Sequence, residues 1–388
     1  MQTYSRLLNP AKEARSKSIY LFGARQTGKT TLLRTTLPDA LYFDLLLSDL
    51  FLDLSLRPQL LRERILSEKE RIVVSNTPVV IDEIQKLPML LNEVHHLIET
   101  HGIVFVLTGS SPRKLKRRGA NLLGGRARTR HLFPLVSSEV PDFDLLRALN
   151  FGTIPSIYLS EDPIDDLKAY CGDYLQQEIQ AEGLVRNIGV FSRFLQTAAL
   201  SNGELINFES LASDSAVTAQ TIREYFTILE DTLIGSMLPP LKKVVHHKAV
   251  SKAKFYFFDV GVANILAQRL EIREKSELFG KAFEHFIYCE LRAYCEYRKD
   301  RRPLSFWRDY RGHEVDFILG DTLALEVKSS SLVTEKHTKG LRMLCEDLPF
   351  RHKVIVSLDA APRKIGDIEV LPWREFLARL WDGEYRGL

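Results

Sequence analysis

The feature that most constrains this chain is the segment Gly23-Ala-Arg-Gln-Thr-Gly-Lys-Thr30. It follows a short apolar run, Ser18–Phe22, and opens a helix-like run, Lys29–Thr36. A glycine-rich turn between a buried strand and a helix points backbone amides at bound phosphate. Lys29 is expected to reach the β- and γ-phosphates, and Thr30 to ligate Mg²⁺. The segment therefore predicts a P-loop that binds ATP through Gly23, Ala24, Arg25, Gln26, Thr27, Gly28, Lys29, Thr30 and Thr31.

A second part of the same site is predicted at residues 78–83, Pro-Val-Val-Ile-Asp-Glu. The three aliphatic residues predict a buried strand, so Asp82 emerges at its carboxyl end, where ligands of parallel α/β sheets collect. Asp82 suits the Mg²⁺ shell beside Thr30, and Glu83 suits activation of the attacking water. Together with the P-loop, this carboxylate pair indicates ATP hydrolysis and not ATP binding alone.

The first 140 residues alternate short apolar runs with longer amphipathic segments. Such runs are typical of strands buried on both faces of a parallel sheet, with crossover helices between them. They occupy residues 18–22, 40–43, 79–81 and 103–108. The last run leads into Thr108 and Ser110, whose hydroxyls could sense the γ-phosphate or orient the water, although a simple turn explains them equally well.

Residues 100–138 contain eight Lys and Arg residues and no Asp or Glu. One interpretation makes Arg126 an arginine finger that enters the ATP site of a neighbouring subunit. Another is a phosphate-contacting patch for nucleic acid, and a third is an ordinary solvated basic face. The eight residues are Arg113, Lys114, Lys116, Arg117, Arg118, Arg126, Arg128 and Arg130.

The middle of the chain, from about residue 165 to 232, has a helical pattern. Residues 208–213 and 219–231 predict two helices joined by a tight turn, and residues 233–240 and 254–258 predict a β-hairpin after them. A helix, a turn, a helix and a β wing form the outline of a winged helix. A helical linker region explains the pattern nearly as well.

The last third contains a second candidate site on a predicted hairpin. The turn at residues 320–322 should place Asp316 opposite Glu326, with Cβ atoms about 5 Å apart. Lys328 lies two residues further along, on the same face as Glu326. With Glu284 from the preceding helix, these residues could hold Mg²⁺ and cleave a phosphodiester. Ion pairing across the hairpin is the alternative.

Composition excludes several classes of protein. The chain has 388 residues, a net charge of +3 and four scattered cysteines, which is typical of reduced thiols in a cytoplasmic protein. No apolar run approaches the ~20 residues that span a bilayer, so no membrane association is expected. The mild positive charge neither requires nor excludes nucleic acid.

Several of these segments together resemble predicted bacterial and archaeal AAA+ ATPases that carry a C-terminal domain of unknown function. The segments are residues 23–30, 80–84, 107–111, 123–126, 132–135, 258–261, 283–284, 314–317 and 326–330. The resemblance implies an α/β fold with a P-loop AAA+ core at 1–140, a helical lid and winged-helix-like domain at 141–270, and a domain at 271–388 similar to PD-(D/E)XK nucleases. It also implies that Arg126 is the finger, that Ser110 or Thr108 is the sensor, and that the chain forms a homo-oligomeric ring such as a hexamer. The second sensor of a AAA+ lid has no counterpart that we could assign.

Three functions follow from these predictions. The leading one is a Mg²⁺-dependent ATPase that couples ATP turnover to binding or remodelling duplex DNA. The alternatives are an ATP-gated DNA nuclease and a signalling or assembly NTPase whose C-terminal half binds protein. A set of basic and aromatic residues favours nucleic acid, although an exposed rim would look the same: Arg298, Lys299, Arg301, Arg302, Trp307, Arg308 and Arg311.

Overall fold

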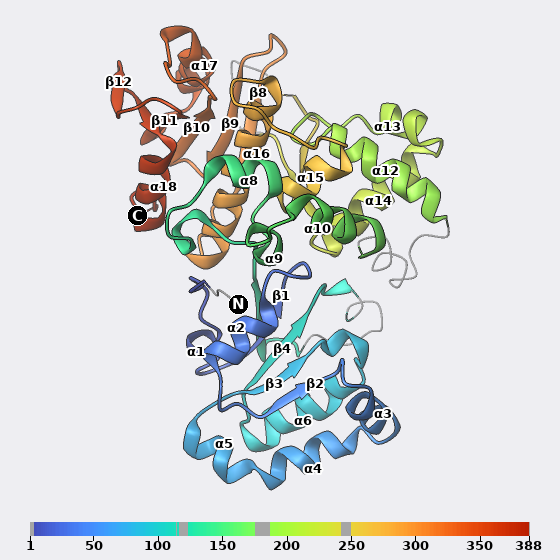
Figure 1. Cartoon of the computed structure of the whole chain (residues 1–388). Helices are drawn as coiled ribbons and strands as arrows, with labels where there is room; N and C mark the ends of the chain where they lie inside the picture. Colours follow the sequence, from blue (N-terminus) through green and yellow to red (C-terminus); the bar gives the residue numbers. More distant parts are fainter. Residues whose placement is uncertain (1–3, 114, 116–122, 175–186, 242–249, 388) are drawn as a thin grey trace. The chain divides into compact units, whose positions relative to one another are not determined.

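The computed structural model describes residues 4–113, 115, 123–174, 187–241 and 250–387. The chain forms two compact units (Figure 1). The first contains Thr3–Pro134 with Asp231–Ile234, and the second contains Leu135–Glu230 with Gly235–Leu388. The boundary predicted at residue 140 falls close to this division, whereas the one predicted at residue 270 lies inside the second unit.

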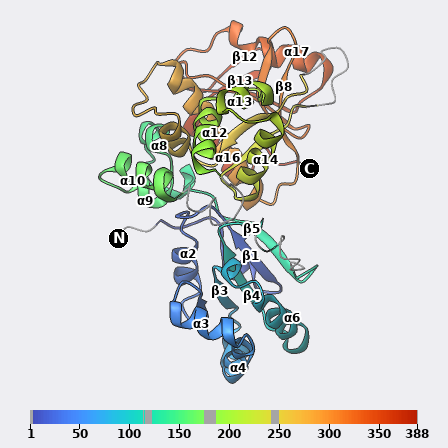
Figure 2. The same ribbon diagram turned by 90° about the vertical axis from the view of Figure 1, so that its right-hand side faces the viewer.

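The first unit is built on a five-stranded sheet in which every neighbouring pair is parallel. Its strand order is β2-β3-β4-β1-β5, with β1 (Ser18–Phe22), β2 (Tyr42–Asp44), β3 (Val79–Asp82), β4 (Phe105–Gly109) and β5 (Ala127–His131). The helices are α1 (Pro10–Glu13), α2 (Lys29–Thr36), α3 (Ser48–Leu56), α4 (Gln59–Ser67), α5 (Lys69–Ser75), α6 (Leu90–His101) and a 3₁₀ turn, Ile84–Lys86. Figure 2 shows α2 on one side of the sheet and α6 on the other. The predicted parallel α/β core is confirmed.

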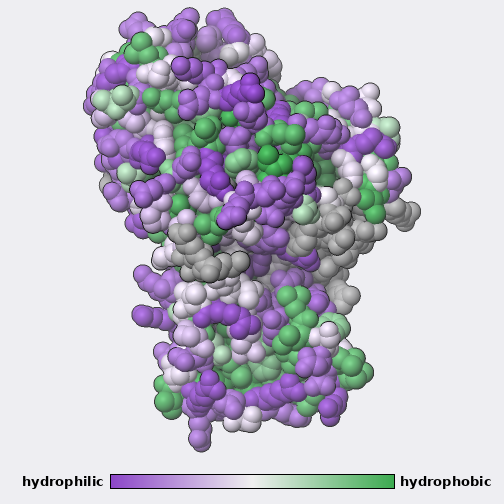
Figure 3. All heavy atoms as spheres, viewed as in Figure 1, coloured by the Kyte–Doolittle hydropathy of each residue, from purple (hydrophilic) through white to green (hydrophobic). Residues whose placement is uncertain are grey.

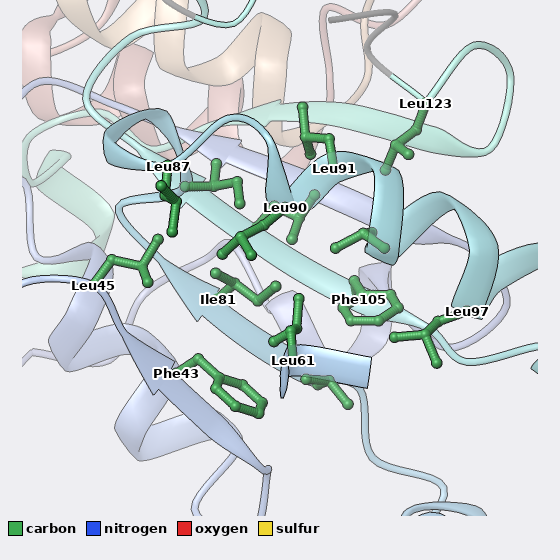
Figure 4. Packing of buried hydrophobic residues seen from close by; sticks show 14 of the residues in the cluster. Phe43, Leu45, Leu61, Ile81, Leu87, Leu90, Leu91, Leu97, Phe105 and Leu123 are labelled. Atoms are coloured by element: carbon green, nitrogen blue, oxygen red, sulfur yellow. The ribbon is translucent and has the colours of Figure 1, made fainter. Parts of the chain in front are cut away.

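The core of this unit explains why its strands read as continuous apolar runs. Every residue of β1, β3 and β4 is buried, because helices cover both faces of the sheet. In Figure 4, Ile81 and Phe105 of the sheet lie beside Leu90 and Leu97 of α6 and Leu61 of α4. Each such side chain contributes ~1.5–3 kcal/mol on burial. The core thus fixes the sheet whose carboxyl edge carries the candidate site.

The middle region of the second unit is mainly helical. Its helices are α8 (Leu145–Phe151), α9 (Pro155–Tyr158), α10 (Pro163–Ala169), a π-helical turn (Tyr170–Tyr174), α12 (Ile188–Leu200), α13 (Phe208–Ser215), α14 (Ala219–Asp231) and α15 (Val260–Leu266), after a 3₁₀ turn at Ser137–Glu139. The antiparallel strands β6 (Gly235–Leu238) and β7 (Lys254–Phe257) follow α14. The Asn207 side chain caps α13, and Ala216 ends it in a left-handed conformation. The predicted order of two helices and a hairpin is therefore observed, and the winged-helix likeness stays a prediction.

The C-terminal region of the second unit contains a mixed six-stranded sheet of order β12-β13-β11-β10-β9-β8. The strands are β8 (Leu304–Arg308), β9 (Glu314–Leu319), β10 (Leu323–Val327), β11 (His352–Ser357), β12 (Arg363–Ile365) and β13 (Ile368–Pro372). The helices are α16 (Glu277–Tyr297), α17 (Lys339–Asp347) and α18 (Trp373–Asp382), with a 3₁₀ turn at Glu335–Thr338. The hairpin of β12 and β13 was not predicted, because β12 is short and charged.

The hairpin of the middle region is joined to this sheet through its edge strand, β8. Phe306 donates its backbone N–H to Pro239 O at 3.1 Å, and Leu241 donates to Phe306 O at 2.7 Å. Val250 donates to Arg308 O at 2.9 Å. These bonds give a physical reason why the middle and C-terminal regions form one compact unit.

The viewed surface mixes hydrophilic and hydrophobic side chains (Figure 3). In the part of the chain that the structure describes, no helix combines the length and the hydropathy needed to cross a membrane.

Candidate functional site

The loop after β1 adopts a conformation that requires glycine at two positions. Gly28, the N-cap of α2, has φ +91°, in the left-handed region that favours glycine. A Cβ at Gly23 would lie 2.4 Å from the carbonyl oxygen of Leu132. Gln26 is also left-handed, with φ 58°. The loop therefore turns tightly between β1 and α2, as the sequence predicted.

Hydrogen bonds from three side chains hold this loop. Lys29 donates from Nζ to Gly23 O at 2.7 Å and to Ala24 O at 3.1 Å. Thr27 Oγ1 also donates to Ala24 O, at 2.8 Å. Arg6, which sequence reasoning missed, donates to Thr27 O at 2.7 Å and to Phe133 O at 2.6 Å. The ammonium group of Lys29 is thus positioned inside the loop, where it can meet phosphate oxygens.

Asp82 lies at the carboxyl end of β3 and is almost fully buried. Its carboxylate accepts hydrogen bonds from three hydroxyls: Thr30 Oγ1 at 2.8 Å, Tyr42 Oη and Thr108 Oγ1. Burial, followed by the hydrogen bond to Asp82, raises the pKa of Tyr42 and keeps this phenol protonated. Thr30 and Asp82 are thus adjacent oxygen donors of the kind that Mg²⁺ prefers, so the residues fit the ion.

Glu83 adopts a left-handed conformation, with φ 62° and ψ 42°, which is uncommon for this residue type. Its backbone N–H donates to Thr108 Oγ1 at 3.1 Å. Burial raises the pKa of its carboxyl, the charge of Lys29 lowers it, and the charge of Asp82 raises it again. Strained backbone of this kind clusters at functional sites, and a carboxylate with a raised pKa suits a general base.

Gln85 connects two of the predicted site residues and was itself missed. Its Nε2 donates to Glu83 Oε2 at 2.5 Å and to Ser110 Oγ at 3.3 Å. The side chain packs over Gly109, where a Cβ would lie 2.5 Å from Gln85 Oε1. The predicted sensor, Ser110, is therefore tied to the predicted base through a buried amide. The signal that could have identified Gln85 was its position in the sequence, two residues after Glu83.

Arg126 lies at the end of the same sheet where the strands begin, opposite to the end that carries the P-loop. It precedes β5, whose first residue pairs with Ser18 at the start of β1. The P-loop, Asp82 and Thr108 lie at the carboxyl ends of the strands, so Arg126 is at the amino ends. Its side chain pairs with Glu99 of α6 and donates to Gly124 O at 3.1 Å. This placement leaves the role in trans as a prediction. Of the predicted basic residues, Lys114, Lys116, Arg117 and Arg118 lie outside the described residues.

The hairpin of the C-terminal region has the predicted register. Leu323 pairs with Leu319, and Leu325 pairs with Phe317. One further step along the strands places Glu326 opposite Asp316. Asp316 Oδ2 accepts the backbone N–H of Val327 at 2.7 Å, and Glu326 Oε1 pairs with Lys328 Nζ at 2.5 Å.

A second lysine, which sequence reasoning missed, completes this cluster. Lys254 of β7 pairs with Glu284 Oε1 at 3.1 Å and with Glu314 Oε1 at 2.5 Å. Tyr256, two residues along β7, donates its hydroxyl to Glu284 Oε1 at 2.5 Å. Glu284, Asp316, Glu326 and Lys328 therefore come together as predicted, joined by Lys254 and Glu314. The signal in the sequence that could have identified Lys254 was its position as the first residue of an otherwise aromatic strand, Lys254–Phe257.

Burial and mutual repulsion shape the ionisation of these carboxyls. Burial, followed by the charge of Glu284, raises the pKa of Asp316 to about 6. Burial and the charge of Asp316 raise the pKa of Glu326 well above its usual value. Burial lowers the pKa of Lys254, but the charges of Glu284 and Glu314 outweigh it, so the amine stays charged. Among the described residues, no three His, Cys, Asp or Glu side chains are arranged to hold a metal ion.

The basic rim proposed for nucleic acid is only partly available. Trp307 is fully buried in the core under α17, so its expected role as an exposed aromatic is wrong. Arg302 pairs with Asp300 at 2.5 Å, and Arg308 pairs with Glu314 at 3.4 Å. The sequence could not show this, because a tryptophan in a strand can face either side of a sheet.

Comparison with models of known protein families gives three matches, one for each of three successive parts of the chain. Residues 15–140 match a family described as an AAA domain. Residues 142–275 and 279–376 match two domains of unknown function, DUF8612 and DUF4143. No curated protein matches the chain.

Three solved structures show a distant likeness. A Walker-type ATPase of Pyrococcus abyssi is 16% identical, with a TM-score of 0.43 over 66% of this chain and 93% of that chain. A STAND protein with a tetratricopeptide repeat sensor from Pyrococcus horikoshii is 14% identical, with a TM-score of 0.24 over 76% of this chain and 47% of that chain. The Aeropyrum pernix ORC1 protein, solved in complex with DNA, is 16% identical, with a TM-score of 0.22 over 65% of this chain and 86% of that chain. The family match and the geometry of the loop together support a AAA-type P-loop domain in the first unit.

Proposed function

We propose that this chain is a Mg²⁺-dependent ATPase of the AAA+ type that converts ATP to ADP and phosphate. The observation that carries the proposal is the hydrogen bond between Thr30 and Asp82, 2.8 Å long, beside a buried Glu83. It joins the end of the P-loop to the end of β3, which supports one site that combines the phosphate loop, the proposed metal ligands and the proposed base. Bound Mg²⁺ would supply charge neutralisation for the phosphates.

Different residues of the chain bind the phosphates, hold the ion and transfer the proton in the proposed reaction. Amides of residues 23–30 and the Lys29 ammonium bind the phosphates, while Thr30 and Asp82 hold the ion. Glu83 takes a proton from the attacking water, and Gln85 orients that carboxylate toward Ser110. Arg126 would stabilise charge in a neighbouring site of a ring-shaped homo-oligomer.

The test compares Glu83→Gln with the exposed, matched substitution Glu63→Gln, using a binding assay with a fluorescent ATP analogue and a phosphate-release assay. Glu83→Gln is expected to keep nucleotide binding and to lose turnover by ~10²-fold or more, because only proton transfer is removed. Turnover at the wild-type rate in Glu83→Gln would show that this carboxylate is not the base.

We further propose that ATP turnover changes how the second unit holds duplex DNA. Two features support this proposal: the order of two helices and a hairpin in the middle region, and the exposed Arg301 and Arg311 of the C-terminal region. An electrophoretic shift with duplex DNA over a salt series tests it, with ATPase rates measured in parallel. Binding through several phosphates weakens steeply as salt rises. Absence of a shift, with turnover unaffected by DNA, would favour a signalling or assembly NTPase whose C-terminal half binds protein.

An ATP-gated nuclease is the second candidate, favoured by one specific arrangement. A helix, three antiparallel strands, a second helix and a parallel strand carry the pair Asp316 and Glu326, as the likeness to PD-(D/E)XK nucleases implies. Cleavage of duplex DNA with ATP and Mg²⁺ or Mn²⁺, lost in Glu326→Ala with ATPase activity intact, is the supporting result. DNA binding without cleavage across metals would make the region a DNA-holding platform.

A further inference from the structure

The carboxylate of Asp82 has one hydrogen-bond partner that belongs to none of the predicted site segments. Tyr42 of β2 donates its hydroxyl to Asp82 Oδ2, the oxygen that also accepts the hydroxyl of Thr30 at 2.8 Å. The other oxygen, Oδ1, accepts the hydroxyl of Thr108. Asp82 is only 1% exposed, so these hydroxyls, and not bulk water, set the orientation of its carboxylate.

The register of the sheet explains why Tyr42 reaches this carboxylate. The strands β2 and β3 are parallel, and Tyr42 pairs with Val80, which lies two residues before Asp82. Paired residues of neighbouring strands, and alternate residues of one strand, point to the same face of a sheet. The side chains of Tyr42 and Asp82 therefore share a face, and the long phenol bridges the offset of two residues.

The ring of Tyr42 is also held from the side of α2. The guanidinium group of Arg34 lies 4.5 Å from the centre of the Tyr42 ring, and Arg34 pairs with Asp44 at 3.9 Å. A cation over an exposed ring contributes ~0.5–1 kcal/mol, which favours this position of the ring. The phenol is thus fixed between the helix that carries Thr30 and the strand that carries Asp82.

The three hydroxyls orient the carboxylate of Asp82 without occupying it completely. An ionised carboxylate has about four lone-pair sites, so three donors leave room for a further ligand. All three donors are neutral, so none of them cancels the negative charge. Carboxylates that bind metal ions are themselves hydrogen-bonded in this way, and such partners fix the direction of the ligand oxygens.

We propose that Tyr42 is a positioning residue of the nucleotide site, whose hydroxyl holds the carboxylate of Asp82 in the orientation that, together with Thr30, accepts Mg²⁺. The inference rests on the proposed ATPase function, because Thr30 and Asp82 are the metal ligands in that proposal. Tyr42 acts only through Asp82. Loss of its hydroxyl therefore weakens the metal-dependent part of nucleotide binding and leaves the contacts between the loop and the phosphates unchanged.

The experiment measures binding of a fluorescent, non-hydrolysable ATP analogue to the full chain, once with Mg²⁺ and once with EDTA. The ratio of the two affinities reports the coupling between metal and nucleotide. The affinity of Mg²⁺ for the free analogue is the same in every measurement, so it cancels between variants. Tyr42→Phe removes only the hydroxyl. The matched control is Tyr20→Phe, because Tyr20 is a buried tyrosine of the same sheet whose hydroxyl has no hydrogen-bond partner among the described residues.

In Tyr42→Phe, the ratio is expected to fall about tenfold to a hundredfold, as for loss of a hydrogen-bond partner of a metal ligand. The affinity in EDTA should equal that of wild type. Half-maximal ATP turnover should require correspondingly more Mg²⁺, and turnover should recover at saturating Mg²⁺. Tyr20→Phe should match wild type in all three measurements.

Three results would overturn the proposal, and they differ in meaning. An unchanged ratio in Tyr42→Phe would show that Asp82 does not need the phenol. Equal weakening with Mg²⁺ and with EDTA, together with a lower unfolding midpoint, would show that Tyr42 supports the fold of the loop and not the metal ligand. Wild-type protein that binds the analogue equally well with and without Mg²⁺ would remove the metal ligands themselves, and only this result also contradicts the proposed function.

Discussion

The two units bury carboxylates in different surroundings. Asp82 of the first unit is held by three hydroxyls, from Thr30, Tyr42 and Thr108. In the second unit, Glu284 and Glu314 are held by the ammonium group of Lys254. A carboxylate paired with neutral donors can accept a cation without leaving an opposite charge unpaired, whereas a carboxylate paired with lysine cannot. The first arrangement is suited to a ligand that comes and goes, and the second to a contact that holds the fold.

Removing the lysine of the nucleotide site should have the largest effect, and the effect should be on function. Lys29→Ala is expected to lower ATP turnover by ~10³-fold and to weaken ATP binding, because it removes the cation on the phosphates. The free energy of unfolding should change by only about 1 kcal/mol for each backbone hydrogen bond lost. The control is Lys86→Ala, an exposed lysine of the same unit. Near-normal turnover in Lys29→Ala would show that the nucleotide site does not need this lysine for function, which contradicts the comparison between the two units.

Substitution of Arg126 tests whether the nucleotide site is formed by one chain alone. The carboxylate cluster, by contrast, is formed by residues of a single chain. Arg126→Ala is expected to bind ATP and to lose turnover by ~10²-fold or more, since a finger stabilises transition-state charge. Mixing Arg126→Ala with Glu83→Gln should restore part of the activity at interfaces that combine an intact finger with an intact base. Mixed oligomers confirmed by mass that show no rescue would rule out action in trans. The control is Arg128→Ala, an exposed arginine of β5.

Removing the lysine of the second unit should instead affect stability. Lys254→Ala leaves two carboxylates without their cation, and breaking a buried pair in this way costs ~3–5 kcal/mol. The low end is expected, because Glu284 and Glu314 keep 24% and 22% of their side chains exposed. The shift in the unfolding midpoint of the second unit measures this cost. ATPase activity below the unfolding temperature should stay normal, and a midpoint equal to that of wild type would mean that the pair contributes little.

Substitution of Gln85 should have the smallest effect, and it tests how Glu83 and Ser110 are positioned in the first site. Gln85→Ala removes the hydrogen bonds to Glu83 and Ser110 but leaves both residues in place. We expect turnover to fall about tenfold with ATP binding unchanged, as for loss of a positioning contact. The exposed Gln59→Ala serves as the control. A fall in binding equal to the fall in turnover would assign Gln85 to the fold of the loop.

The sequence was sufficient for the P-loop because that site is local. The glycines at positions 23 and 28, the lysine and the threonine follow one another along a single strand, turn and helix. Asp82 could be added because parallel strands bring their carboxyl ends to one edge. The register of Asp316 and Glu326 was also predictable, since a short hairpin turn fixes it.

Contacts between distant segments could not be predicted in the same way. Arg6 reaches Phe133 across 127 positions, and Lys254 reaches Glu284 across 30. No periodicity or motif relates such residues, because tertiary packing alone brings them together. For the same reason Trp307 could not be assigned to the buried face, although the strand that carries it was predicted.

The attachment of the middle-region hairpin to β8 also matters for aggregation. Strand edges with free backbone groups are templates for pairing with other chains. In the six-stranded sheet, the segment around Pro239 and Leu241 covers part of the β8 edge, and the other edge is the short strand β12, which carries Arg363 and Lys364. A fragment cut near residue 270 would keep the sheet but uncover β8. Such a fragment should self-associate, so the shortest soluble piece of the C-terminal region is expected to include the hairpin of β6 and β7.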